Sequence, residues 1–449
     1  MNKTKSIYSC QNCGAQSPKW LGRCSSCNEW NTFIEEVVSK EKSKNPLITK
    51  INHPYLIKDI PIQNESRIKF LDSEFNRVLG GGIVAGSVVL LAGEPGIGKS
   101  TLLLKLALTI NKKVLYVSGE ESADQIKMRA ERLKSESNNC YIFNETQIAS
   151  IFNQAEKLNP ELIIIDSIQT SYSDNIDSSP GSVSQIKECA NQFIKYAKTK
   201  SIPIIIIGHI TKEGAIAGPK VLEHMVDTVL HFEGDKNYLF RIVRSIKNRF
   251  GNTSELGIYE MSEKGLIEVK NPSQVLISEN KEQLSGVTIG CMIEGNRAIM
   301  LEVQALTSPA TYGNPQRSAT GYDLRRLNML LAVLEKRAGL KLNQKDIFLN
   351  ITGGIKLIDP AADLSIICAI LSSNFDLCIS SKTCFSGEIG LSGEVRPVSR
   401  IDQRIKEAEK LGMKKILISK YSKIETKKSS NINIVKIGKV QELVQYLFK

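Results

Sequence analysis

The segment that most limits the possible folds is residues 88–108, where a glycine-rich turn separates an apolar run from a leucine-rich run. The first run, VVLLAG, predicts a buried strand, and the second, TLLLKLAL, predicts a helix. Between them, residues 93–100 follow the pattern Gly-x-x-x-x-Gly-Lys-Ser. Glycines in such a loop let backbone N–H groups surround phosphates. A strand, this loop and a helix in that order predict a P-loop domain that binds ATP.

The loop supplies most of the predicted ATP site. Lys99 is expected to reach the terminal phosphates, and the Ser100 hydroxyl is expected to ligate Mg²⁺. ATP and Mg²⁺ are therefore the cofactors predicted for this part of the chain. The full set of residues expected to bind ATP is Gly93, Glu94, Pro95, Gly96, Ile97, Gly98, Lys99, Ser100 and Thr101.

Two further apolar runs end in carboxylates. Residues 160–170 place Asp166 after four apolar residues, the Walker B arrangement that delivers a carboxylate toward Mg²⁺. Residues 112–122 place Glu120 and Glu121 just after an apolar strand, and a carboxylate at that strand tip could polarise the attacking water. The same two glutamates also favour the start of a helix, and the two roles are compatible.

A fourth apolar run, within residues 201–214, ends at His209. A histidine at this strand tip is either a packing residue or a sensor of the ATP phosphate, and the residues alone favour neither. Strands and helices that alternate in this way predict an α/β core with a parallel sheet. Ligands of such a core bind at the carboxyl ends of the strands.

The first 35 residues carry a second kind of site. Two Cys-x-x-Cys pairs separated by ten residues predict a tetrahedral zinc site rather than disulfides in a reducing cytoplasm. A module this short needs a cross-link such as a bound metal ion to fold, and Trp20 and Trp30 are expected to pack it. A site closed by four thiolates is structural, not catalytic. The expected Zn²⁺ ligands are Cys10, Cys13, Cys24 and Cys27.

Composition and charge restrict the class of protein and its partners. Of 449 residues, 41% are hydrophobic and 24% charged, as in ordinary globular proteins. No apolar run is membrane-sized and the N-terminus shows no signal segment, so we expect a cytoplasmic protein without a membrane partner. The net charge is +12, and residues 400–449 hold 13 Lys or Arg against 5 Asp or Glu. This excess indicates either nucleic-acid binding or a solvated lysine-rich face.

The cysteine pairs, GEPGIGKS (93–100), IIIDS (163–167) and KNRFG (247–251) together resemble the motifs of the RecA-type recombination ATPases. The resemblance implies a DNA-dependent ATPase that forms a homo-hexameric ring. It also implies single-stranded and branched DNA as partners, together with the RecA recombinase. The expected organisation is a C4 zinc finger at 1–35, a polar, proline-containing linker at 36–66 and a RecA-like ATPase domain at 67–275.

In RecA-type rings, two cations at the place of KNRFG reach across the subunit interface. The resemblance therefore implies that Lys247 and Arg249 act on the γ-phosphate of the ATP held by the next subunit. It also implies that Glu120 activates water, and it places His209 where RecA has a glutamine. The implied catalytic set is Lys99, Glu120, Asp166, Lys247 and Arg249.

Two loops of the ATPase domain are implied by the same resemblance to face DNA. They are residues 170–182 and 211–224, which are rich in Gly, Ser and Pro. The second loop carries Lys212 and Lys220.

The last part of the chain, residues 285–449, resembles the Lon-protease domain in DPAADLSIICAIL and GEIGLSGEVRPVSRIDQ. The positions of that family's serine and lysine hold Ala361 and Asp402, which supply neither a nucleophile nor its base. Ser365 lies in the following helix and lacks a dyad partner. We therefore expect an α+β domain that is proteolytically inactive and is kept for assembly and binding.

Two classes of function remain after these observations. The leading hypothesis is a ring motor that uses ATP to promote branch migration and to process recombination intermediates during break repair. An ATP-gated scaffold that binds DNA or repair proteins without translocating needs the same P-loop and stays open. An ATP-dependent protease is disfavoured because Ala361 has no nucleophile.

Overall fold

The computed structural model divides into two compact units, Met1–Val269 and Lys270–Lys449. Cys13, Lys212 and most of the predicted linker 36–66 lie outside the described residues, as does the side chain of Lys220. The described residues are 5–10, 15–38, 56, 67–135, 137–209, 219–234, 240–278, 284–310, 315–354, 356–425 and 431–448.

The amino-terminal module is a small antiparallel sheet in the order β2 (Gln16–Ser17), β1 (Lys5–Cys10) and β3 (Phe33–Val38). Cys10 and Cys24 are fully buried, and Phe33 packs with them. The expectation that Trp20 and Trp30 pack this module is wrong, because the two residues are 53% and 67% exposed. The cysteine side chains and Phe33, rather than the two indole rings, form its centre.

The core that contains the P-loop segment is built on a nine-stranded sheet. From β8 to β11 neighbouring strands run parallel, and β12, β13 and β14 extend the sheet as antiparallel hairpins. The strand order is β14 (Gly265–Glu268), β13 (Leu256–Ser262), β12 (Phe240–Asn248), β11 (Thr228–Glu233), β6 (Val88–Gly93), β10 (Ile204–His209), β9 (Leu162–Asp166), β7 (Val114–Ser118) and β8 (Cys140–Asn144). A separate pair joins β4 (Arg67–Ile68) to β5 (Ile83–Val84).

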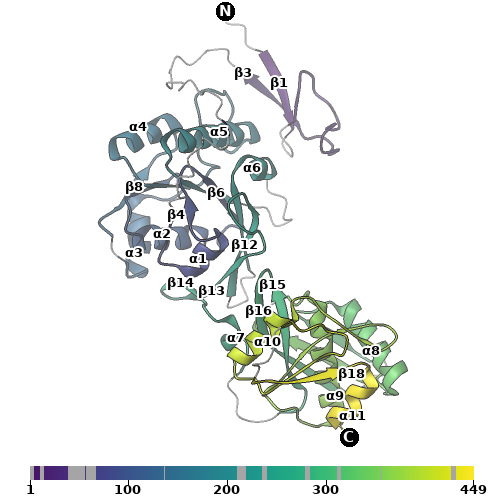
Figure 1. The fold of residues 1–449 in the computed structure, drawn as a ribbon. Helices are drawn as coiled ribbons and strands as arrows, with labels where there is room; N and C mark the ends of the chain where they lie inside the picture. Colours follow the sequence, from purple (N-terminus) through teal and green to yellow (C-terminus); the bar gives the residue numbers. More distant parts are fainter. Residues whose placement is uncertain are drawn as a thin grey trace, which may run out of the picture. The chain divides into compact units, whose positions relative to one another are not determined.

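Helices cover both faces of this sheet (Figure 1). Alternate residues of β6 enter different cores: Val89 and Leu91 pack on one face, and Val88 and Leu90 on the other. A strand buried on both faces explains the unbroken apolar run in the sequence. The first core contains residues of α1 (Ser73–Val78), α2 (Lys99–Thr109) and α3 (Ala123–Arg132), and the second those of α4 (Ile148–Leu158), α5 (Val183–Lys200) and α6 (Pro219–Met225).

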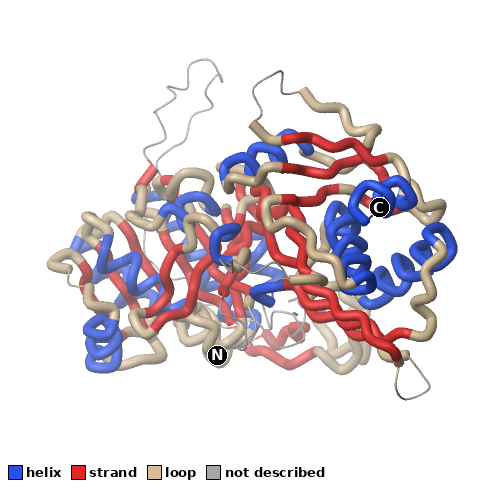
Figure 2. Tube along the Cα trace, turned by 90° about the horizontal axis from the view of Figure 1, so that it is seen from below, coloured by secondary structure: helices blue, strands red, loops and turns tan. Residues whose placement is uncertain are grey.

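The second unit is a mixed α+β domain on a seven-stranded sheet, drawn in red beside its helices in Figure 2. Its strand order is β17 (Arg317–Thr320), β18 (Lys345–Ile351), β16 (Arg297–Pro309), β15 (Val287–Glu294), β19 (Thr383–Ser386), β22 (Lys415–Ser419) and β23 (Asn433–Ile437). A short hairpin joins β20 (Glu388–Ile389) to β21 (Val395–Arg396). The helices are α7 (Pro272–Val275), α8 (Leu324–Ala338), α9 (Asp363–Phe375), α10 (Ile401–Lys410) and α11 (Val440–Phe448).

None of the helices in the described parts of the chain combines the length and the apolar composition needed to cross a bilayer.

A buried arginine ties the second unit together. The Arg404 side chain on α10 is 1% exposed, and it donates to Asp359 Oδ2 at 2.7 Å and to the Cys291 carbonyl at 2.6 Å. Asp359 also accepts from the backbone N–H groups of Ile293 and Ala361. One cation therefore joins three segments that are distant in sequence.

Arg404→Met is expected to destabilise the second unit by about 3–5 kcal/mol, because it leaves a carboxylate with no cationic partner. Native-state hydrogen exchange of the buried amides of α9 would measure the loss within this unit. Lys406→Met, an exposed change on the same helix, is the matched control and should have little effect. Equal protection in the two variants would contradict the structural role of Arg404.

Candidate active site

The P-loop geometry explains why its glycines are needed. Strand β6 ends at Gly93, and helix α2 begins at Lys99 after the turn. Gly96 and Gly98 have φ angles of +76° and +115°, a region that residues with a Cβ rarely adopt. The turn leaves the first N–H groups of α2 without helical acceptors, and such a helix start attracts phosphate.

Lys99 is folded into this loop. It is 3% exposed, and its ammonium donates to the carbonyls of Gly93 at 2.7 Å and Glu94 at 2.8 Å. His209 Nδ1 lies 3.1 Å from the same ammonium. Burial lowers the pKa of Lys99 to about 8, against the effect of the nearby carboxylates. A phosphate placed in the loop would restore the charge balance of this ammonium.

Glu120 lies next to this lysine environment. Its Oε1 accepts from the Ser167 hydroxyl at 2.5 Å and lies 3.2 Å from His209 Nε2. The contact with His209, together with Ser167 and the Lys99 charge, lowers the pKa of Glu120 to about 2 despite partial burial. Glu120 is therefore an ionised carboxylate that can orient a water and accept its proton.

The structure shows which residue caps the helix that follows the two glutamates. Helix α3 is capped by Ser122, whose side chain accepts from the Gln125 N–H in a reciprocal capping box. Glu121 instead forms an ion pair with Arg129. Neither function uses Glu120, which leaves its carboxylate in the site with His209.

His209 connects the two halves of the site. Its Nδ1 faces Lys99 and its Nε2 faces Glu120, and its side chain is 25% exposed. Both ring nitrogens therefore contact predicted site residues, which favours the sensor alternative, and the sensor role stays a prediction. The sequence signal was its place at a strand tip. Its contact partners depend on the pairing of β10 with β6 and β9, which the sequence does not reveal.

Asp166 offers a ligand position suited to Mg²⁺. Tyr116 donates to its Oδ2 at 2.6 Å, while the buried Oδ1 has no hydrogen-bond partner among the described residues. Burial raises the pKa of Asp166, and the neighbouring Tyr116 and Ser100 hydroxyls oppose that rise. A buried carboxylate oxygen near a serine hydroxyl matches the oxygen ligands that Mg²⁺ prefers.

Lys247 and Arg249 do not contact their own nucleotide site in the described residues. The Lys247 ammonium donates to the carbonyls of Glu223 at 2.8 Å, His224 at 3.1 Å and Val226 at 2.9 Å. These three bonds use all of its donors and hold the end of α6 against β12. Both burial and Arg249 lower the pKa of Lys247.

Arg249 keeps most of its donors. Its side chain is 51% exposed, and the one guanidinium contact within the described chain is from Nη1 to Asp227 Oδ1 at 3.2 Å. Asp227 is itself anchored, because its Oδ2 accepts from the Val88 N–H at 3.0 Å. The carboxylate thus orients the arginine from one side and leaves further N–H groups for a ligand.

Two other residues of KNRFG shape the loop, and the sequence analysis missed them. Asn248 Oδ1 accepts from the Phe250 N–H at 2.9 Å. A Cβ on Gly251 would lie 3.0 Å from the Gly80 Cα, so this close approach requires a residue without a side chain. Arg67 joins the backbone segments around Gly80 and Phe250. Its guanidinium donates to the Phe250 carbonyl at 2.8 Å and to the Gly80 carbonyl at 2.7 Å.

The amino-terminal cysteines converge as a metal site requires. The sulfurs of Cys10, Cys24 and Cys27 all lie within 4.8 Å of one another, and Cys10 Sγ is 3.7 Å from Cys27 Sγ. Zn–S bonds of about 2.3 Å in a tetrahedron place two sulfurs about 3.8 Å apart. The three described thiols therefore fit Zn²⁺, and the predicted fourth ligand, Cys13, lies outside the described residues.

Cys27→Ser is expected to remove zinc from the protein and to unfold residues 5–38, because a module of this size depends on its metal. Metal analysis of the purified chain would measure the zinc content. Cys378→Ser, a change at an exposed cysteine of the second unit, is the control and should keep it. One zinc per chain in both variants would contradict the thiolate site.

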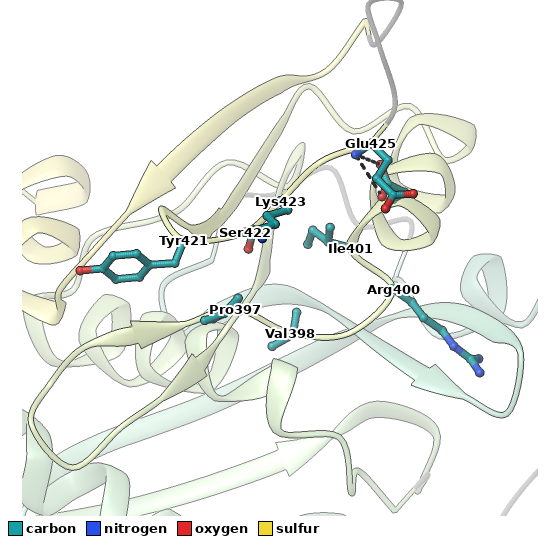
Figure 3. Close-up of a pocket in the computed structure, with 9 residues that line it drawn as sticks. Pro397, Val398, Arg400, Ile401, Tyr421, Ser422, Lys423 and Glu425 are labelled. Carbon is teal, nitrogen blue, oxygen red and sulfur yellow. Dashed lines mark hydrogen bonds between the residues drawn. The ribbon is translucent and has the colours of Figure 1, made fainter.

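The positions of the Lon-type catalytic pair hold structural residues. Ala361 is fully buried, and the buried Ser365 donates its hydroxyl to the Ala362 carbonyl at 2.7 Å. Asp402 Oδ1 accepts from the backbone N–H of Glu425 at 3.2 Å, beside an open cavity of about 470 Å³ (Figure 3). Asp402 thus helps to hold the loop that lines this cavity.

Comparisons with known proteins cover the whole chain. Residues 8–35 match a model described as a rubredoxin metal binding domain, residues 58–215 an AAA domain, and residues 318–422 the ChlI subunit of Mg-chelatase. The DNA repair protein RadA of Bacillus subtilis is 48% identical, with 99% of each chain covered. The chain belongs to the RadA family.

Other RadA proteins show the same full-length likeness. That of Listeria monocytogenes is 46% identical over 99% of this chain and 98% of its own, and that of Streptococcus pyogenes is 47% identical over the whole of both. A solved KaiC-like protein of Pyrococcus horikoshii is 17% identical over 45% of this chain and 99% of its own, with a TM-score of 0.37. Membership in the RadA family, with the matched AAA domain and zinc-binding module, identifies an ATP-binding protein with a zinc ribbon.

Proposed function

We propose that this RadA-family chain is a DNA-dependent ATPase that works as a ring motor. Its task would be to promote branch migration and to process recombination intermediates beside the RecA recombinase during DNA repair. The observation that carries the proposal is the contact chain Lys99–His209–Glu120, which links the phosphate-binding lysine to an ionised carboxylate. The names of its relatives support DNA as the partner.

Each residue of the site has a proposed role in hydrolysis. Lys99 and the loop N–H groups bind the ATP phosphates, and Ser100 and Asp166 hold Mg²⁺, which when bound neutralises phosphate charge. Glu120 orients the attacking water and takes its proton. His209 reports the state of the phosphates to Glu120, because one ring faces both the lysine and the carboxylate.

Arg249 is proposed to act on the ATP of the neighbouring subunit in a homo-hexamer. Its half-exposed guanidinium, oriented from one side by Asp227, supports this role. A cation supplied in trans stabilises the charge that develops on the transferred phosphoryl group and couples hydrolysis to ring geometry. Lys247 is proposed to assist by fixing the end of α6 to the strand that leads to Arg249.

DNA is proposed to contact two regions. Residues 170–182 and 211–224 would face a single strand within the ring, with Lys212 and Lys220 in the second loop. The basic segment 400–449 would contact the phosphates of duplex arms without reading their sequence. Contacts of this kind weaken steeply as salt rises.

Two other functions fit the observations less well. A protease would need a nucleophile where Ala361 is buried and a base where Asp402 holds a loop. An ATP-gated scaffold is the stronger alternative, because binding without translocation needs the same nucleotide site. Only the motor predicts directional strand separation.

The proposal is tested by ATP hydrolysis of the purified full-length chain with and without single-stranded DNA, at low and at raised salt. We expect DNA to stimulate hydrolysis and the stimulation to fade as salt rises. Hydrolysis that ignores DNA would contradict a DNA-driven motor. Stimulated hydrolysis without unwinding of a forked substrate would favour the scaffold.

A further inference from the structure

The exposed face of the zinc ribbon has no role in the function proposed above, and it is unusually aromatic. Trp20 and Trp30 are the two tryptophans of the entire chain, and more than half of each side chain is exposed. A Cβ placed on Gly22 would lie 3.7 Å from the Trp20 ring and 3.9 Å from the Trp30 ring. Both indoles therefore lie beside the same glycine, and we call the surface that these two exposed residues form the indole patch.

The indole patch is held in place by its own module. The Trp20 indole N–H donates to the Phe33 carbonyl at 3.1 Å. The Asn31 N–H donates to the Gly22 carbonyl at 2.8 Å, which joins the segments that carry the two rings. The buried Cys24 lies between these two segments in the sequence. Rings fixed in this way lose little conformational freedom when a ligand binds.

A cation completes the surface. The guanidinium of Arg23 lies 5.7 Å from the centre of the Trp30 ring, and its Nε donates to the Asn28 carbonyl at 3.0 Å. Lys19 is exposed immediately before Trp20. A fixed pair of aromatic rings beside cations fits a ligand that combines flat aromatic groups with negative charge. The bases and phosphates of a single nucleic-acid strand have this chemistry.

We propose that the indole patch is a stacking platform for the bases of single-stranded DNA. This site is separate from the ATPase loops and from the basic segment 400–449. Over residues 5–38 as a whole, Lys5, Lys19 and Arg23 are matched in number by Glu29, Glu35 and Glu36, so the module carries no net charge and binding here should depend mainly on the bases and only weakly on salt. Contacts made mainly through phosphates have the opposite behaviour.

Tryptophan fluorescence tests the proposal directly, because both tryptophans of the chain lie in the patch. Full-length zinc-loaded protein is titrated with an oligothymidylate and with an abasic strand of equal length, while fluorescence anisotropy of a label on the DNA reports total binding. Stacking predicts quenching by the oligothymidylate and none by the abasic strand. The quenching should persist at raised salt.

Trp30→Ala is expected to weaken binding of the oligothymidylate roughly fivefold or more at raised salt, where stacking dominates, and to leave abasic-strand binding unchanged. Ile34→Ala removes an exposed apolar side chain of the same module without removing a ring, and it is the matched control. Unchanged zinc content in both variants verifies that the ribbon is folded.

Four outcomes separate this inference from the proposed function. DNA binding without quenching, or equal losses in Trp30→Ala and Ile34→Ala, overturns the stacking platform and leaves the DNA-dependent ATPase standing. Quenching by the abasic strand also overturns it, because bases are then unnecessary. Failure to bind any DNA overturns both the platform and the proposed function.

Discussion

Arg249→Ala is expected to slow DNA-stimulated ATP hydrolysis by about 10³-fold or more, the usual effect of losing an arginine that acts on a phosphoryl group in trans. ATP binding should change little, because Arg249 contacts Asp227 and not the P-loop of its own subunit. The steady-state hydrolysis rate and the affinity for a fluorescent ATP analogue would be measured on the same preparation.

A mixing experiment identifies the subunit in which Arg249 acts. Lys99→Ala subunits lose ATP binding but keep Arg249, whereas Arg249→Ala subunits keep the P-loop. If Arg249 serves the neighbour's ATP, mixed rings should regain hydrolysis that neither variant has alone. Arg244→Ala is the matched control, since this arginine lies on β12, the strand that leads to Arg249, and pairs with Glu233. An active Arg249→Ala enzyme, or mixtures as inactive as their parents, would exclude the trans role.

Glu120→Gln is expected to lower the hydrolysis rate by about 10²–10⁴-fold, because the amide cannot accept a proton from water. The change keeps the size of the side chain, so ATP should still bind. A single-turnover measurement with bound ATP would separate the chemical step from binding and release.

Glu121→Gln provides the control for Glu120. Both carboxylates follow the same strand, but Glu121 pairs with Arg129 and makes no contact with His209 or Ser167 in the described residues. The pKa of Glu120 is about 2, below that of an ordinary glutamate, so its carboxylate stays ionised as pH falls toward 5. A rate that Glu120→Gln leaves unchanged, or that falls equally in Glu121→Gln, would remove Glu120 from the mechanism.

Several parts of this protein follow from the sequence because their signals are local. The P-loop needs a strand, Gly96 and Gly98 in a left-handed turn, and a helix, all within about twenty residues. The Cys-x-x-Cys spacing likewise determines a metal geometry, and three of its sulfurs converge as expected. Strand β8 was missed because it lies at the sheet edge and is only partly buried, so its apolar signal is weak.

Other features required the tertiary structure, because their partners are far apart in the chain. His209 and Glu120 meet across 89 positions, and Lys247 reaches the end of α6 only after β12 pairs with β11. The sequence pattern predicts that Trp30 packs the centre of the amino-terminal module, but cysteine side chains lie there and Trp30 is exposed. Sequence determined the local geometry of the phosphate and zinc sites, since a few neighbouring dihedral angles set it. Folding alone decided which distant side chains share a site and which rings remain exposed.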